Sequence, residues 1–308
     1  MKISSVGGVI AAASNSAAYP LLQLGTMTSI RRIVVSLKQA GVFPIVVVTG
    51  ANEGEVRYQL SANGIVFLLS EETEAPELIE SARLGLSFLE NKCEKVIFAP
   101  VNIPLFSPNT LDSLIQSKKR IATPSYQGKG GHPVCLETSI ISKILAYKGV
   151  GGLRQAIASM EEEREWVNVE DPGILLTIHN RKELEEYTEV HNKEIIRPIV
   201  QLNMEHDSIL FNTRTKLLLV LIAHTHSVRG ACNLMSISYS NGWDMLNRIE
   251  HELCYLLVDR KHGGSKGGRT DLTKEGYDFL KAYQKMEENV SKFTKEQFEE
   301  LLLKPGIV

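Results

Sequence analysis

The amino-acid sequence predicts a three-layer α/β domain followed by a smaller winged helix-turn-helix domain. Strand and helix signals alternate from the N-terminus to about residue 192, which is the pattern of a layered α/β domain. The order then changes, and Ser227–Leu280 reads as helix, turn, helix, strand, glycine-rich basic loop, strand and helix. That order is typical of a winged helix-turn-helix, a shape suited to placing one helix in the major groove of DNA.

Short apolar runs predict the buried strands of the first domain, and longer runs with helical spacing predict its helices. The predicted strands are Val6–Ala13, Pro44–Thr49, Gly64–Leu68, Lys95–Ala99 and Ile174–Ile178. The predicted helices are Thr28–Ala40, Glu53–Ala62, Pro76–Glu90, Pro108–Ser117, Ser139–Tyr147 and Arg181–His191. Ser107 and Pro108 support the fourth helix, because serine caps a helix and proline suits its first turn.

A boundary is predicted near His191–Arg197, which gives domains of residues 1–192 and 193–308. Beyond it, two strands around a polar turn precede an amphipathic helix. The predicted strands are Ile199–Met204 and Ile209–Phe211, the turn is Glu205–Ser208 and the helix is Thr213–His224. After the winged helix-turn-helix, a long helix over Thr273–Phe293 and a short one over Lys295–Leu303 are predicted. The long helix has apolar residues at helical spacing and is a candidate dimer seam.

The composition is that of a soluble globular protein, since 43% of the 308 residues are hydrophobic and 23% are charged. Four scattered cysteines without a CxxC pair argue against a zinc site and fit reduced thiols. No run approaches the ~20 apolar residues that span a bilayer, so a cytoplasmic protein without a membrane partner is expected. The N-terminus superficially resembles a signal peptide, but Gly7 and Gly8 interrupt its apolar run, which favours a first buried strand.

The net charge of −2 is unevenly distributed. Between Arg214 and Lys285, eleven Lys and Arg residues stand against seven acidic residues, a surplus of four. Such a surplus permits binding to a phosphate backbone, but many solvated surfaces have the same excess.

Several phrases of the first domain occur in the order seen in the molybdenum-cofactor nucleotidyltransferases. They are YPLLQLG at Tyr19–Gly25, VVVTG at Val46–Gly50, SARLGL at Ser81–Leu86, VIFAPVNIPLFSPNTL at Val96–Leu111, GGHPV at Gly130–Val134, GGLR at Gly151–Arg154 and EDPGILLTI at Glu170–Ile178. The first domain therefore resembles the MobA/MocA-like family. The resemblance implies a Rossmann-like, GT-A-like three-layer fold, in a family whose enzymes transfer CMP or GMP onto a molybdopterin.

The residues that carry the family's chemistry are altered in this chain. Nucleotidyl transfer needs a glycine-rich phosphate loop, cations and carboxylates that hold Mg²⁺. Where the family pattern is roughly AAGxSxRMGxxK, this chain has AAASNSAAYP, without Arg or Lys between Lys2 and Arg31. The family's metal-binding Asp is Asn102, a neutral amide where Mg²⁺ prefers an anionic oxygen. Later family acids are replaced at Val150 and at Thr177–His179. We therefore predict a degenerate active site without catalytic residues or a metal.

The resemblance also implies that five residues lie near a bound ligand. Ser81 and Arg83 match positions close to the nucleotide, Gly131 and His132 match a loop near the pterin, and Asn102 occupies the degenerate metal position. The simpler alternatives are that Ser81 and Arg83 form a helix surface, that Gly131–Pro133 is a tight turn and that His132 is a hydrogen-bonded structural histidine. No cofactor is certain. A nucleotide or a molybdopterin is the ligand that the resemblance suggests, and Mg²⁺ is expected only if the domain is active.

The second domain contains HSVRGA at His226–Ala231, SYSNGW at Ser238–Trp243, LLVDR at Leu256–Arg260 and GGSKGGRTDLTKEG at Gly263–Gly276. From about Arg197 to Val290 the chain thereby resembles the DNA-binding domain of ModE, the molybdate-responsive regulator, and more distantly the LysR-type regulators. The turn LMSIS is one residue longer than the family's usual turn, which leaves open the direction in which the second helix points.

The candidate DNA-binding residues are Ser238, Tyr239, Ser240, Asn241 and Arg248 on the second helix, with Lys261, Lys266 and Arg269 in the wing. Short polar side chains at a helix start reach base edges or phosphates, whereas wing cations contact phosphates and give position rather than sequence choice. A solvated surface role remains open for Arg248. Trp243, Leu246 and Ile249 recur at helical spacing and are predicted to be core residues.

Three functions remain open from the sequence. The first is a transcriptional regulator whose degenerate nucleotidyltransferase domain senses a nucleotide, a pterin or a molybdenum-related species. The second is an active CTP- or GTP:molybdopterin nucleotidyltransferase that also binds DNA, and the third is a scaffold that binds no small molecule. The first is the one we favour, with double-stranded DNA and a small-molecule effector as partners and a homodimer as the assembly, because a symmetric dimer reads a palindromic site.

Overall fold

The computed structural model describes residues 4–13, 19–60, 64–70, 78–149, 152–160, 163–261 and 269–303. The chain divides into two compact units. The N-terminal unit comprises residues 1–60 and 65–197, and the C-terminal unit comprises residues 61–64 and 198–308. No helix among the described residues is long and apolar enough to cross a membrane.

The described strands of the N-terminal unit form an eight-stranded sheet in the order β10-β7-β9-β6-β1-β4-β5, with β8 paired to β7. The strands are β1 (Val6–Ala11), β4 (Ile45–Thr49), β5 (Ile65–Leu69), β6 (Lys95–Pro100), β7 (Ile121–Tyr126), β8 (Lys129–Gly130), β9 (Val134–Glu137) and β10 (Arg164–Asn168). Neighbouring strands are parallel except at β9, which is antiparallel to both β6 and β7, and at β8. A separate hairpin pairs β2 (Gln23–Leu24) with β3 (Met27–Thr28).

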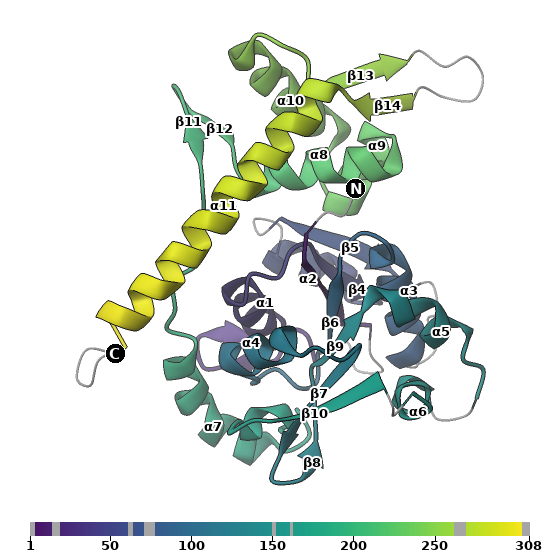
Figure 1. Ribbon diagram of the computed structural model, residues 1–308, viewed down its shortest axis with the longest axis vertical. Helices are drawn as coiled ribbons and strands as arrows, with labels where there is room; N and C mark the ends of the chain where they lie inside the picture. The colour runs from purple at the N-terminus through teal and green to yellow at the C-terminus, as the bar shows by residue number, and fades with distance from the viewer. Residues whose placement is uncertain are drawn as a thin grey trace. The chain divides into compact units, whose positions relative to one another are not determined.

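Helices cover both faces of this sheet, as Figure 1 shows. On one face α1 contacts α2 and α4, and on the other face α3 packs on the central strands and contacts α5 and α6. The helices are α1 (Ser29–Gln39), α2 (Glu53–Leu60), α3 (Leu78–Leu89), α4 (Pro108–Gln116), α5 (Ile141–Ala146), α6 (Gly152–Ala158) and α7 (Arg181–Glu194), with short 3₁₀ turns at Thr138–Ile140 and Pro172–Ile174. The predicted α/β fold of this domain is confirmed, and its sheet is largely parallel.

Apolar patterning explains why these elements form. All six residues of β1 are buried, as expected for a strand covered on both faces. In α1 the buried apolar residues follow helical spacing at Ile30, Ile33, Val34 and Leu37. Ser107 caps α4 by accepting a hydrogen bond from the Thr110 amide at 3.2 Å, as the sequence predicted.

The predicted strand at Ile174–Ile178 is wrong. Pro172–Ile174 is a 3₁₀ turn, and the residues that follow belong to no strand. The sheet has its edge strand instead at β10, whose sequence REWVN has only two apolar residues and no fully buried one. Its neighbour β7 was also missed, because Pro124 lies inside it and proline argues against a central strand.

The C-terminal unit contains a small hairpin, three helices, a second hairpin and a long helix. The elements are β11 (Met204–Glu205), β12 (Ile209–Phe211), α8 (Thr213–Thr225), α9 (Val228–Met235), α10 (Tyr239–Leu253), β13 (Val258–Lys261), β14 (Arg269–Leu272) and α11 (Lys274–Leu301). Both hairpins are antiparallel. The helix α8 is central, because it contacts α9, α10, α11, β12 and β14.

Two helices of this unit differ from the predictions. The first is α8, which is not amphipathic, since eight consecutive residues from Thr215 to Ile222 are buried. The second is α11, a single 28-residue helix in place of the predicted pair. Its sequence contains neither Gly nor Pro between Phe293 and Lys295, so nothing there ends the helix. The predicted strand over Ile199–Met204 is reduced to the two residues of β11.

Candidate ligand site and candidate nucleic-acid surface

The carboxyl edge of the parallel strands is the natural place for a ligand in the N-terminal unit. Asn102 follows β6 at this edge. Because β9 runs antiparallel to β6, with Val134 opposite Phe98, the residues Gly131–Pro133 that precede β9 reach the same edge. The geometry therefore brings Asn102, Gly131 and His132 to one end of the sheet.

The segment Ile174–Ile178 connects these residues. The Ile178 amide donates to the Asn102 carbonyl at 2.9 Å, and the His132 amide donates to the Ile174 carbonyl at 3.1 Å. A Cβ atom on Gly131 would lie 2.4 Å from the Ile174 carbonyl oxygen. Gly131 is therefore required for this close approach, and the segment forms hydrogen bonds with the site loops in place of a strand.

His132 is held neutral. Burial lowers its pKa to about 4, and its Nδ1 atom is buried without a hydrogen-bond partner among the described residues. A neutral imidazole offers either a donor or an acceptor at that nitrogen, depending on its tautomer. This buried polar atom lacks the hydrogen bond expected of a structural histidine.

Ser81 and Arg83 lie on α3 in different surroundings. Ser81 is fully buried, so it is not helix surface, and its hydroxyl has no partner among the described residues. Arg83 is half-exposed, and its guanidinium donates to the Glu80 carboxylate at 2.6 Å and to the Tyr147 carbonyl at 3.0 Å. In the described part of the chain, no hydrogen bond joins either residue to Asn102 or His132.

The residues at this edge do not fit a Mg²⁺ ion. Asn102 supplies a neutral amide, whereas Mg²⁺ prefers carboxylate oxygens. The oxygens of Asp171, a buried acid that follows β10, already accept from the Ser107 amide, the Thr110 hydroxyl and the Gly173 amide at 2.6–2.9 Å. Within the described ranges, no group of three or more His, Cys, Asp or Glu side chains is arranged to hold a metal. No phosphoryl-transfer step follows from this arrangement.

Two contacts at this edge were not anticipated. The rings of Tyr19 and His179 meet edge to face at 5.4 Å between centroids. Asp171 also accepts a long hydrogen bond of 3.4 Å from Tyr187, whose hydroxyl lies 3.4 Å from the carboxylate of Glu194. The only sequence signal for Asp171 was its place in the phrase EDPGILLTI, and nothing in the sequence pairs Tyr19 with His179.

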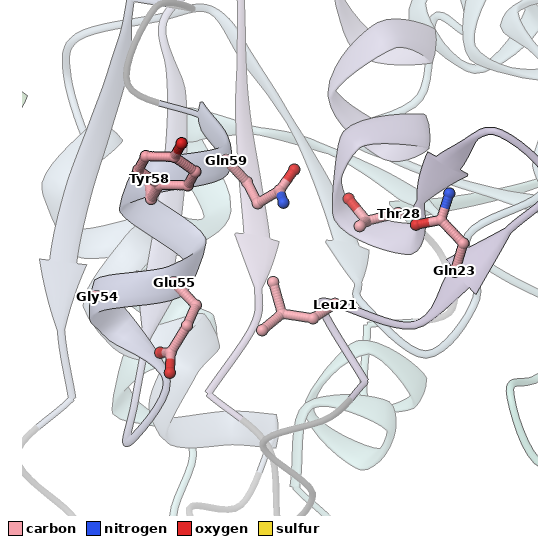
Figure 2. A pocket seen from close by; sticks show the side chains of 7 residues that line it. All are labelled: Leu21, Gln23, Thr28, Gly54, Glu55, Tyr58 and Gln59. Atoms are coloured by element: carbon pink, nitrogen blue, oxygen red, sulfur yellow. The ribbon is translucent and has the colours of Figure 1, made fainter.

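A pocket of about 560 Å³ opens on the N-terminal unit (Figure 2). One wall is α2 and the other is the β2–β3 hairpin with the residues before it. Its lining residues are Leu21, Gln23, Thr28, Gly54, Glu55, Tyr58 and Gln59. Glu55 is the one charged residue among these lining residues. Because its carboxylate is negative, the described lining favours neutral or cationic groups over phosphate.

In the C-terminal unit, α9 and α10 meet through a short turn. Ser236 has a left-handed backbone conformation, with φ of 54°, and the Ile237 amide donates to the Cys232 carbonyl at 3.0 Å. Ser238 caps α10 by accepting from the Asn241 amide at 3.1 Å. A Cβ atom on Gly242 would lie 2.3 Å from the Cys232 sulfur, so glycine allows the two helices to approach closely.

The first turn of α10 presents polar side chains to solvent. Ser238, Tyr239, Ser240 and Asn241 are all exposed, and so is Arg248 further along the helix. Leu246 and Ile249 are fully buried, as predicted. Trp243 is only partly buried and lies under the Arg260 guanidinium at 4.0 Å, so its prediction as a core residue is wrong.

The hairpin β13–β14 carries the predicted wing cations. Lys261 and Arg269 face each other in register, while Lys266 and the side chain of Lys261 lie outside the described residues. The Arg269 guanidinium forms a two-point ion pair with Asp271, at 2.7 and 3.0 Å. This pair lowers the pKa of Asp271 to about 2. His226 completes the cluster, with Nδ1 2.6 Å from Asp271.

Comparison with known proteins supports the fold of the N-terminal unit. The structure is similar to a nucleotidyl transferase from Methanothermobacter thermautotroptrophicus, with a TM-score of 0.54 and 20% identity over 60% of this chain and 98% of that one. It is also similar to Rv0371c from Mycobacterium tuberculosis, with a TM-score of 0.51 and 19% identity over 60% of this chain and all of that one. At these identities the likeness concerns the fold alone.

Two sequence matches accompany the structural ones. A stretch of 66 residues is 36% identical to the transcriptional regulator ModE of Yersinia pestis, covering 21% of this chain. This chain spans a quarter of the length of that relative. Residues 17–164 match the family model of the MobA-like NTP transferase domain. This match and the structural likeness agree on a nucleotidyltransferase-like fold for the N-terminal unit.

Proposed function

We propose that this protein is a DNA-binding transcriptional regulator whose MobA-like domain binds a small-molecule effector without transferring a nucleotide. The observation that carries the proposal is the exposed first turn of α10, where Ser238–Asn241 project from the second of two closely packed helices beside the β13–β14 hairpin. We interpret α8–α11 with this hairpin as a winged helix-turn-helix. The partial match to a ModE regulator supports that interpretation.

In this proposal α10 enters the major groove and the hairpin contacts the phosphate backbone. Ser240 and Asn241 are short polar residues at the start of α10, and such side chains reach base edges. Arg248 is exposed two turns after Asn241 along the helix and suits a backbone contact. Lys261, Lys266 and Arg269 are assigned to phosphates, which makes their contribution dependent on salt.

The effector is proposed to bind at the carboxyl edge of the sheet. Two buried polar atoms support this, the hydroxyl of Ser81 and Nδ1 of His132, because both lack partners among the described residues and buried polar groups are normally hydrogen-bonded. Asn102 and Gly131 complete the proposed site. We assign a nucleotide or a pterin as the effector class, on the match to the MobA-like NTP transferase domain.

A homodimer through α11 is part of the proposal. Met286 and Phe293 are 42% and 61% exposed and lie seven residues apart, on one face of this helix, so that together they offer an apolar contact to a second copy. Sedimentation of the parent chain and of a Met286→Glu, Phe293→Glu variant tests it. We expect a dimer for the parent and a monomer for the variant, and a monomeric parent would remove this part of the proposal.

Two measurements test the main proposal. The first is a thermal-shift screen of the full chain against nucleotides, pterins, molybdate and tungstate, in which one class should raise the melting temperature. The second is pyrophosphate release with Mg²⁺, CTP or GTP and molybdopterin. We expect none from the parent. Release that rises in Asn102→Asp would favour the alternative, an active nucleotidyltransferase, while absence of DNA binding would favour a scaffold.

A further inference from the structure

Four stacked side chains form a continuous row across α9, α10 and β13. The guanidinium carbon of Arg229 lies 5.0 Å from the centre of the Tyr239 ring. The Tyr239 ring meets the Trp243 ring edge to face at 6.0 Å, and the guanidinium carbon of Arg260 lies 4.0 Å from the centre of the Trp243 ring. We call these residues the stacked row.

The two arginines of the stacked row differ in their other partners. Arg260 donates to the Asn247 side chain at 3.1 Å and lies 3.6 Å from the buried Glu250 carboxylate. Arg229 is exposed, and in the described part of the chain it has no ion-pair or hydrogen-bond partner. The positive charge of Arg260 is therefore already balanced, whereas that of Arg229 is available to a ligand.

Glu250 fixes the supporting end of the row. Its carboxylate accepts from the amides of Leu257 and Val258 at 2.8 and 3.0 Å, so it is held rigidly at the start of β13. Arg260 is anchored to that carboxylate and covers Trp243. Trp243 in turn supports Tyr239, which is 45% exposed. Each side chain thus restricts the next one, ending at Arg229.

A guanidinium stacked on an aromatic face keeps the N–H donors at its outer edge free. Stacking also restricts the rotamers of a long side chain before it binds, which reduces the entropy lost on association. Those donors match the geometry of a phosphate oxygen pair. A phosphodiester is therefore the ligand that the exposed end of this row fits best.

We infer that Arg229 is a phosphate contact of the DNA-binding surface, and that Tyr239, supported by Trp243 and Arg260, is the residue that positions it. The inference rests on the proposed DNA binding of this unit. It assigns the contact to Arg229 at the start of α9, a residue outside the wing. It also gives Tyr239 a positioning role, in which it acts through Arg229.

The experiment measures binding of the full chain to a short fluorescent duplex of mixed sequence over a range of salt concentrations. Arg229→Ala should weaken binding about tenfold at moderate salt and reduce the salt slope by about one. Tyr239→Leu should weaken binding about threefold, whereas Tyr239→Phe, which keeps the ring and loses only the hydroxyl, should weaken it less. The double variant Arg229→Ala, Tyr239→Leu should bind no more weakly than Arg229→Ala alone.

The matched control is Arg181→Ala, which removes one exposed arginine of the N-terminal unit and should change neither affinity nor slope. Melting curves confirm that each variant is folded. If the parent binds the duplex but Arg229→Ala keeps its slope, the inference is wrong while the proposed function stands. If the two single losses simply multiply in the double variant, Tyr239 does not act through Arg229. A parent that binds no duplex at any salt removes the proposed function itself.

Discussion

Nη1 of Arg32 lies 3.2 Å from Nδ1 of His191, and both side chains are fully buried in the N-terminal unit. The other ring nitrogen of His191 lies 3.2 Å from the Phe106 carbonyl, and Nε of Arg32 donates to the Leu24 carbonyl at 3.0 Å. This pattern requires a neutral His191 that accepts from Arg32 and donates to Phe106. The pair therefore ties α1 to α7 and to the loop after β6.

The first prediction concerns the pH dependence of this pair. Burial, reinforced by the Arg32 charge, lowers the pKa of His191 from 6.5 to about 4. Between those values the unfolded chain binds a proton that the folded chain does not, so stability falls as the pH drops through this window. The loss approaches about 3 kcal/mol for a fully buried histidine. Denaturant unfolding at several pH values measures it.

The two tryptophans make that measurement specific. Trp166 belongs to the N-terminal unit and Trp243 to the C-terminal unit, so fluorescence of a Trp243→Phe background reports the N-terminal unit. In this background His191→Gln should be less stable near neutral pH, and its loss of stability between pH 6.5 and 4 should be smaller. His251→Gln, at an exposed position, is the control. An unchanged slope in His191→Gln would show that this histidine does not cause the acid sensitivity.

A second prediction concerns Gly131. A methyl group there would lie 2.4 Å from the Ile174 carbonyl oxygen, so Gly131→Ala must displace the segment that connects Asn102 and His132. We expect the unfolding free energy of the N-terminal unit to fall by about 1–3 kcal/mol. Gly54→Ala is the matched control, since no atom lies within 4 Å of its added Cβ and alanine favours a helix. Equal stability of both variants contradicts the close contact.

The sequence predicted the parts of the fold that rest on apolar periodicity. Buried runs such as β1 and β4 were found because both faces of their strands are covered. The sequence predicted a strand at Ile174–Ile178, which is irregular, and missed the strand β10. The reason is that an edge strand has few apolar residues while an irregular buried segment has many. Periodicity reports burial, and burial alone does not separate a strand from a packed loop.

The candidate ligand site and the candidate nucleic-acid surface show the same limit of prediction from sequence. Asn102, Gly131 and His132 lie at one edge of the sheet because β6 and β9 place them there, but their role in ligand binding remains a prediction. The ion pair of Arg269 with Asp271 and the stacking of Arg229 on Tyr239 depend on rotamers and on residues distant in sequence. No spacing rule reveals such contacts, so neither the pairing of Arg269 nor the stacking of Arg229 could be predicted from the sequence.

The third prediction concerns Lys216, which is buried in α8 and forms an ion pair with Glu287 of α11. Burial lowers the pKa of this lysine, and Glu287 opposes that shift. Glu287→Ala should destabilise the C-terminal unit by about 3 kcal/mol, because the ammonium loses its carboxylate partner in a buried place. The double variant Lys216→Met, Glu287→Leu should recover most of that loss. Chemical denaturation followed by Trp243 fluorescence measures both, and a double variant as unstable as Glu287→Ala contradicts the argument.

The fourth prediction concerns Glu194 in the last turn of α7. Burial, together with the nearby Asp171 charge, raises its pKa from 4.5 to about 7. In this window the folded chain binds a proton that the unfolded chain lacks, so this group makes stability fall as the pH rises from 4.5 to about 7 and has no further effect above it. Glu194→Gln should therefore gain stability relative to the parent above pH 7 and not below 4.5. Asp171→Asn should shift the same transition to lower pH, and a transition that stays in place excludes the coupling.

The fifth prediction concerns the pairing of Arg269 with Asp271. A guanidinium held at two points by a carboxylate is a weakened partner for a phosphate, because the local charge is neutralised. If Arg269 contacts DNA as proposed, Asp271→Asn should tighten binding to a mixed-sequence duplex several-fold and steepen its salt dependence.

The Arg269→Ala background distinguishes this explanation from a general loss of negative charge. In that background Asp271→Asn should have little further effect, since the cation that it releases is gone. Asp259→Asn, which removes a carboxylate from the facing position on β13, serves as the charge control. Equal tightening by both Asn substitutions would assign the effect to the overall field of the hairpin. Tightening by Asp271→Asn alone, abolished by Arg269→Ala, would identify Asp271 as an internal competitor of the phosphate backbone.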